Sequence, residues 1–193
     1  MQTYPATPVD NPQTKAEILA ELNKAFDALA ETTITMDQTA YDTIPHGDKW
    51  SAAGHHEHIM LSNAASATAL KQPAAFFARF GALDRAPLNY QDLKSTYQEK
   101  SKRVVLKPSS KYAPTANAPK SREELLTSWK MVQTKLNERL NKWSDEELEK
   151  AVLPHPAVGL MTMKEMMLFT IYHTWHHIDG MEKAAKGEFF LRS

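Results

Sequence analysis

The chain has 193 residues, 42% of them apolar and 24% charged, and its 23 basic side chains balance its 23 acidic ones. This size and composition are typical of one soluble globular domain with a well-buried core. The neutral balance argues against a nucleic-acid or anionic-membrane partner. The lack of cysteine excludes disulfides, cysteine zinc sites and a thiol nucleophile.

The sequence shows no targeting or membrane-spanning segment. Residues 1–14 are polar and dotted with prolines, without the basic start and apolar core of a secretory signal peptide. No stretch approaches the roughly 18 apolar residues that a transmembrane helix requires. We therefore expect a cytoplasmic protein with a flexible N-terminal arm over residues 1–13 and a single domain over residues 14–193.

Two long helices are predicted in the first half of the domain. Thr14 is a good N-cap with Glu17 as its capping-box partner, and apolar residues then repeat at helical spacing, which predicts a helix over residues 14–31. Ser51 is a second good N-cap, and the next proline marks the end of its helix, which predicts a helix over residues 51–70.

The second half is predicted to add three helices and two loops: a short helix over residues 89–104, a loop over 108–119, a long helix over 121–140, a proline-broken loop over 153–159 and a last helix over 162–183. No segment shows the clear alternation of a strand. Four long helices, with a long connection between the second and the third, predict an all-α fold, a four-helix bundle with a long crossover connection.

The most informative motif lies in the last helix. His173 and His177 are four residues apart, so on a helix they share a face and both imidazoles can reach one point. A helix offers two ligands to a divalent metal in this way. His176 also lies three residues from His173 and could chelate with it, although it lies one residue outside the helix face that carries His173 and His177. The alternative is that these are surface or hydrogen-bonded core histidines.

A second histidine cluster lies in the first two turns of the helix over residues 51–70. His58 continues in phase with small side chains that allow a close approach of helices, so we predict it as the third ligand. We expect His55 and His56 on the surface. No general base can be named from the sequence; His55 and His176 are the candidates if they turn inward.

The last helix carries a second apolar stripe that includes Ile171, Trp175 and Ile178. An exposed stripe of this kind would be larger than a monomer normally tolerates, so we predict a homodimer. Burial of the stripe against the protein's own long connection would explain it equally well.

Three segments in the correct order resemble the DinB-like (damage-inducible) family of metal-dependent enzymes. Trp50-Ser51 followed by His58 resembles the start of the family's second helix. Residues 154–162 resemble the segment that leads into its last helix, and His173 with His177 resembles its closing His-x-x-x-His. The order and spacing match across residues 14–185, although each motif is short. Gly54 departs from the family pattern, in which a helix-favouring or acidic residue is more usual.

The resemblance implies a DinB-like four-helix bundle, usually homodimeric, in which His58, His173 and His177 bind a divalent metal ion. Nickel or zinc is expected, with manganese or iron as alternatives. Relatives include thiol S-transferases that use low-molecular-weight thiols such as bacillithiol, and a mycothiol-dependent isomerase. The implied function is that of a metal-dependent thiol S-transferase or hydrolase acting on a small electrophile, with a small-molecule substrate and, by the same implication, a low-molecular-weight thiol as partner.

The alternative is a non-catalytic helical-bundle module for stress or partner binding, with adventitious metal or none. A working metal site should hold the second ring nitrogen of each ligand on a carboxylate, a carbonyl or water, which distinguishes the two readings once a structure is known. His155 lies between two prolines, outside the helical phase, and is not expected to take part.

Overall fold

A computed structural model describes residues 11–45, 49–103, 109–115 and 120–188. These residues form α-helices, one 3-10 helix and one antiparallel hairpin, in the order α1 (Lys15–Thr35), α2 (Gln38–Asp42), α3 (Ala52–Leu70), η1 (Ala74–Phe80), α4 (Tyr90–Arg103), α5 (Arg122–Leu140), α6 (Asp145–Lys150), β1 (Val152–His155), β2 (Gly159–Thr162) and α7 (Met163–Ala185).

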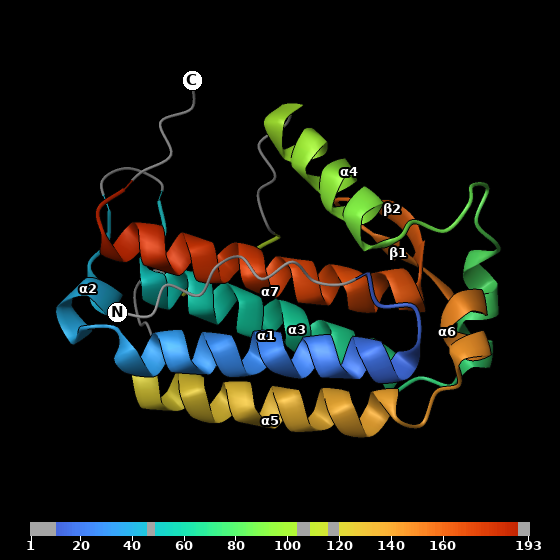
Figure 1. Cartoon of the computed structure of the whole chain (residues 1–193), viewed down its shortest axis with the longest axis horizontal. Helices are drawn as coiled ribbons and strands as arrows, with labels where there is room; N and C mark the ends of the chain where they lie inside the picture. The colour runs from blue at the N-terminus through green and yellow to red at the C-terminus, as the bar shows by residue number, and fades with distance from the viewer. Residues whose placement is uncertain (1–10, 46–48, 104–108, 116–119, 189–193) are drawn as a thin grey trace.

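The long helices α1, α3, α5 and α7 form a four-helix bundle (Figure 1). α3 packs against both α5 and α7, and α1 packs against the same two helices. The connection from α3 to α5 carries η1 and α4, and α4 lies against α7 outside the bundle. The predicted all-α bundle with a long crossover connection is therefore confirmed.

Local capping explains where the long helices begin. Thr14 and Glu17, Ser121 and Glu124, and Thr162 and Glu165 each form a capping box, and Ser51 caps α3 through the amide of Gly54. Each capping side chain satisfies backbone N–H groups that a helix leaves without intrahelical partners. The predicted helix starts are confirmed to within a residue.

The bundle core is centred on large apolar side chains of facing helices. Trp129 of α5 is 2% exposed and stacks on Phe26 of α1 with 4.2 Å between ring centroids. Its indole Nε1–H donates to the Phe26 carbonyl (2.9 Å), so its polar atom is paired. Burying a large side chain of this kind contributes about 2–3 kcal/mol.

Residues 152–162 correct one prediction. We expected a loop over residues 153–159, but β1 and β2 pair as a hairpin in which Pro154 lies opposite Leu160. A two-stranded sheet has two edges, so a proline can lie where no partner needs its N–H. The hairpin is held mainly by tertiary burial of Leu153 and Met161 and not by local alternation, which is why the sequence pattern did not indicate it.

The second apolar stripe of α7 is largely buried within the single chain. Ile171 is fully buried and Ile178 is 4% exposed, while Trp175 is partly buried. The surface argument for a homodimer therefore does not hold, because this monomer already covers the stripe. The homodimer itself stays a prediction.

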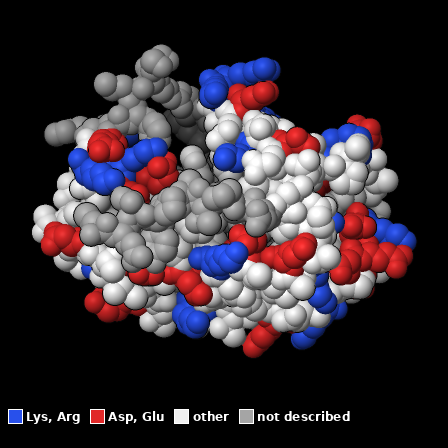
Figure 2. All heavy atoms as spheres, in the orientation of Figure 1, with Lys and Arg blue, Asp and Glu red and all other residues white. Residues whose placement is uncertain are grey.

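The outer surface carries mixed charge. Figure 2 shows acidic and basic side chains interspersed over the face in view. Most of the predicted N-terminal arm lies outside the described residues, but Asn11 accepts a hydrogen bond from the Tyr90 amide (3.0 Å), so its last residues contact the start of α4. No described helix has both the length and the apolar character needed to cross a bilayer.

Candidate metal centre

α7 brings its two predicted histidines to one point. His173 and His177 lie one helical turn apart on the buried side of α7, and their Nε2 atoms are 3.0 Å apart. His58 of α3 faces the same point, and one ligand atom from each of the three side chains lies within 4.8 Å of the other two. All three histidines are buried. The structure thus brings together the three side chains that the sequence singled out.

The donor set fits a divalent metal ion. Imidazole nitrogens bind such ions at about 2.0–2.1 Å, so two of them at an angle near 90° would lie about 3.0 Å apart. The Nε2 atoms of His173 and His177 have this separation. Three nitrogens and no carboxylate make up the group, which is a set that suits zinc, nickel, copper and iron.

A backbone carbonyl orients His58. Its Nδ1–H donates to the Tyr112 carbonyl (2.7 Å), which leaves Nε2 as the nitrogen with a free lone pair. The segment that carries Tyr112 is itself tied to α3, because the buried Glu57 carboxylate accepts hydrogen bonds from the amide (2.8 Å) and hydroxyl (2.9 Å) of Thr115. Metal-binding histidines are typically oriented by an outer partner of this kind.

His55 orients His177, which corrects its predicted surface position. The Nδ1 atoms of the two rings are 2.9 Å apart, so one of them carries the shared hydrogen. When His177 binds an ion through Nε2, Nδ1 must hold its hydrogen and donate it to His55. Gly180 makes this contact possible, since a Cβ there would lie 2.5 Å from Cε1 of His55.

Trp50 covers the same group of rings. Its ring centroid lies 4.8 Å from that of His58 and 6.1 Å from that of His177. A Cβ at Gly54 would lie 3.1 Å from the Trp50 Cβ, so the glycine that departs from the family pattern leaves room for the tryptophan.

His56 was also expected on the surface, and this was wrong. It is fully buried, and its Nδ1 lies within hydrogen-bond distance of the Tyr41 hydroxyl (2.9 Å) and the Thr33 hydroxyl (3.3 Å). α3 is enclosed by α2, α5 and α7, so even the side of the helix away from His58 is covered. His56 belongs to the core and takes no part in the candidate centre.

Burial keeps the converging histidines neutral. It holds the pKa of His173 and of His177 well below the usual value, and the neighbouring histidines lower both further. Burial also lowers the pKa of His58, partly opposed by the Tyr112 carbonyl. Neutral imidazoles are the form that binds a metal, so these rings are ready to bind one at neutral pH.

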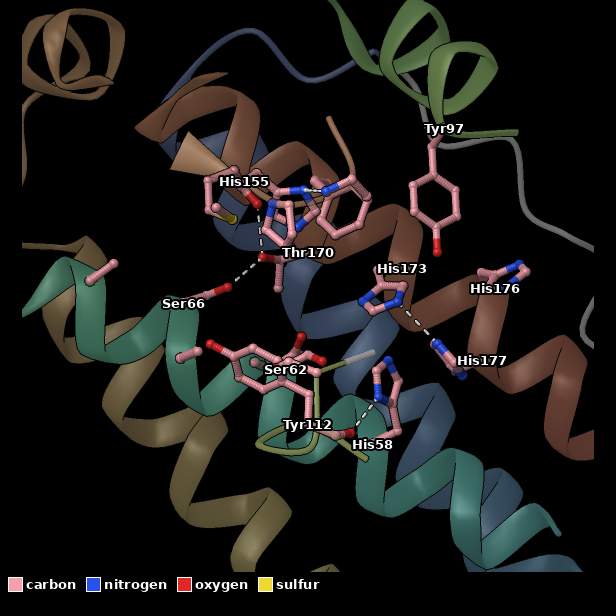
Figure 3. Close-up of a pocket in the computed structure, with 18 of the residues that line it drawn as sticks. His58, Ser62, Ser66, Tyr97, Tyr112, His155, Thr170, His173, His176 and His177 are labelled. Atoms are coloured by element: carbon pink, nitrogen blue, oxygen red, sulfur yellow. Dashed lines mark hydrogen bonds between the residues drawn. The ribbon is translucent and has the colours of Figure 1, made fainter. Parts of the chain in front are cut away.

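The three histidines line a pocket of about 520 Å³ between α3, α7, the β1–β2 hairpin and α4 (Figure 3). Two side chains that the sequence analysis did not assign to a site also line it. His155 stands in the hairpin, with its ring 4.5 Å from that of Phe169, and Tyr97 of α4 has its ring 6.1 Å from that of His173. His176 lines the pocket too, but it is exposed and is not one of the converging group.

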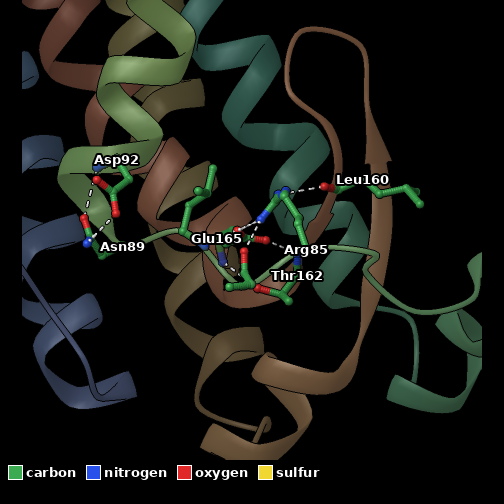
Figure 4. Close-up of polar contacts among 8 residues, drawn as sticks. Arg85, Asn89, Asp92, Leu160, Thr162 and Glu165 are labelled. Atoms are coloured by element: carbon green, nitrogen blue, oxygen red, sulfur yellow. Dashed lines mark hydrogen bonds and ion pairs between the residues drawn. The ribbon is translucent and has the colours of Figure 1, made fainter.

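An ion pair with a buried carboxylate joins the start of α7 to the segment before α4 (Figure 4). Glu165 is 1% exposed, and its carboxylate accepts hydrogen bonds from Arg85 Nη1 (2.7 Å) and the Leu88 amide (2.6 Å). The same side chain accepts from the Thr162 amide (2.6 Å) as part of the capping box. One carboxylate therefore ties the segment before α4 to the end of β2 and to the first turn of α7.

The sequence model of the DinB superfamily matches residues 21–179. The matched range includes His58, His173 and His177 and runs from α1 to α7. No curated protein and no solved structure matches the chain.

Proposed function

The chain belongs to the DinB superfamily, and we propose that it is a metal-dependent enzyme in which His58, His173 and His177 bind a divalent ion beside a small-molecule pocket. The observation that supports this most is the convergence of three buried, neutral imidazoles at the wall of that pocket. An ion held by three neutral ligands would keep open positions. It would lower the pKa of a bound water towards about 7 or bind a thiol as its thiolate, and either supplies a nucleophile.

The surrounding residues support this function by fixing the rings. The Tyr112 carbonyl holds His58 with Nε2 free, and His55 holds His177. A working site was expected to hold the second ring nitrogen of each ligand on a carboxylate, a carbonyl or water. His58 meets this through the Tyr112 carbonyl, and for His177 an imidazole, His55, takes that place. Trp50 covers the rings from one side and limits the access of water.

The reaction that fits best is transfer of a thiol or of water to a small electrophile, as in a thiol S-transferase or a hydrolase. Nickel and zinc are the preferred ions, with manganese and iron as alternatives. A low-molecular-weight thiol would be the second substrate of the transferase.

The test is turnover of a panel of small electrophiles with several low-molecular-weight thiols, with and without added nickel, zinc or manganese. His173→Ala should lose activity, because two remaining imidazoles hold a divalent ion much more weakly. Lys135→Ala, an exposed position on α5, is the control and should behave as the wild type. Metal-independent turnover, or full activity of His173→Ala, would refute the mechanism and favour the non-catalytic module.

A further inference from the structure

The pocket beside the histidines has an uncharged lining over the residues that the structure describes. None of the described residues that line it is Asp, Glu, Lys or Arg. Burial lowers the pKa of His155, the histidine of the hairpin, to about 4. Lys100 of α4 is close enough to His155 to lower that pKa further, but it is exposed and is not part of the lining.

The part of the pocket contributed by the hairpin and the first turns of α7 is mainly apolar. Leu153 and Pro154 come from β1, and Met166 and Phe169 come from α7. The Phe169 ring lies between the pocket's two polar ends, 4.5 Å from the ring of His155 and 4.9 Å from that of His173. A ligand that extends from the histidines towards the hairpin therefore passes along an aromatic face.

The hydroxyl groups of Ser66 on α3 and Thr170 on α7 are polar groups in the lining of the same pocket (Figure 3). The Thr170 hydroxyl donates to the Met166 carbonyl (2.8 Å), so its hydrogen is already used. Ser66 lies 3.1 Å from the Thr170 hydroxyl and must therefore be the donor of that bond. The lone pairs of the Ser66 oxygen are then free to accept a hydrogen bond from a ligand.

His155 offers a hydrogen-bond donor to a ligand. Its Nδ1 accepts hydrogen bonds from the amides of Ala157 and Val158 (both 3.2 Å), so the hydrogen of the neutral ring is on Nε2. Beyond the histidines the pocket thus has an acceptor in Ser66 and a donor in His155, and the described side chains there offer no counter-charge for an ion.

We propose that the portion of the substrate beyond the histidines is uncharged, a partly apolar group that carries hydroxyl or carbonyl functions. The inference rests on the proposed function, because the reacting end is taken to lie at the three histidines. A carboxylate or an ammonium group in the part of the pocket beyond the histidines would lose its hydration without gaining an opposite charge from the described side chains around it. Hydroxyl and carbonyl groups would find partners in Ser66 and His155.

The experiment uses three aryl hydroxamic acids with the same metal-binding group and different tails. Benzohydroxamic acid with a 4-hydroxymethyl, a 4-carboxy or a 4-aminomethyl substituent is titrated into the zinc-loaded protein, and binding is measured by calorimetry. The hydroxymethyl probe should bind at least about ten-fold more tightly than either charged probe.

A charge placed in the pocket supplies the second measurement. Ser66→Asp should improve binding of the aminomethyl probe relative to the hydroxymethyl probe by about ten-fold or more. Thr68→Asp, on the same helix but exposed and outside the lining, should leave that ratio unchanged. If Ser66→Asp fails to fold, the wild-type ratios decide alone.

The outcomes separate the two proposals. Equal binding of the three probes, or tightest binding of a charged one, would overturn the uncharged pocket and leave the metal site standing. No binding of any probe would overturn the metal site, and this inference with it.

Discussion

Gly180→Ala should weaken metal binding without weakening the fold. The new Cβ would lie 2.5 Å from Cε1 and 2.7 Å from Nδ1 of His55, closer than real Cβ contacts come. The backbone of α7 is held by the bundle, so the His55 ring must move, and its hydrogen bond to His177 is lost. Gly180 touches neither metal nor substrate in this account, so its effect reports on His55 alone.

The substitution is expected to lower the metal affinity but not the free energy of unfolding. Loss of the outer partner of a metal-binding histidine costs about 10–100-fold in affinity, and we expect the lower end, because His55 is a neutral partner and not a carboxylate. Alanine in place of glycine within a helix favours folding by about 1 kcal/mol, offset in part by the lost packing of His55. Zinc affinity should therefore fall about ten-fold, while the free energy of unfolding stays level or rises.

The assay is chelator competition for zinc together with urea unfolding of the metal-free protein. His55→Ala should match Gly180→Ala in affinity, and the double variant should show no further loss, since both remove the same hydrogen bond. His55→Asn should retain most of the affinity, because its side-chain oxygen can stand near the position of Nδ1. Wild-type affinity in Gly180→Ala, or fully additive losses in the double variant, would refute the role of His55.

Two further predictions concern stability. Burial lowers the pKa of His56 from 6.5 to about 3, so the folded state holds the ring neutral. The stability that the neutral ring provides is complete above about pH 6.5, and it is lost as the pH falls below that value because the unfolded state then takes up a proton. The difference in unfolding free energy between wild type and His56→Asn should thus shrink by about 2 kcal/mol from pH 7.5 to pH 5 in EDTA, and a constant difference would contradict this. Glu165→Ala should lower the unfolding free energy in urea by about 2–4 kcal/mol, since it leaves two amides and Arg85 without their acceptor. Glu165→Gln should lose less, and a loss below about 1 kcal/mol in Glu165→Ala would show that the carboxylate does not tie these segments.

The parts of the fold that sequence could predict are those encoded locally. Thr14, Ser121 and Thr162 each stand three residues before a glutamate, so the helix starts follow from neighbouring residues alone. The four-residue spacing that places His173 and His177 on one helix face can also be seen in the local sequence. His58 was predicted from the small side chains that follow it on the same face of its helix.

What the sequence could not predict depends on distant segments. His55 and His56 were expected on the surface, but His55 is partly buried and His56 fully buried, because other helices enclose α3, which no local pattern encodes. The Tyr112 carbonyl is a backbone atom and carries no residue signature, and its position depends on the contact of Glu57 with Thr115. His155 lay outside the helical phase, yet the hairpin brings it to the pocket.

The most direct test of the central claim is the metal stoichiometry of the chain, purified without a histidine tag. Elemental analysis and calorimetric titration with zinc and nickel should give one divalent ion per wild-type chain. His173→Ala should lose this ion, while Lys135→Ala should keep it. A wild-type chain that binds no divalent ion, or a His173→Ala chain that binds one as tightly as the wild type, would contradict the account.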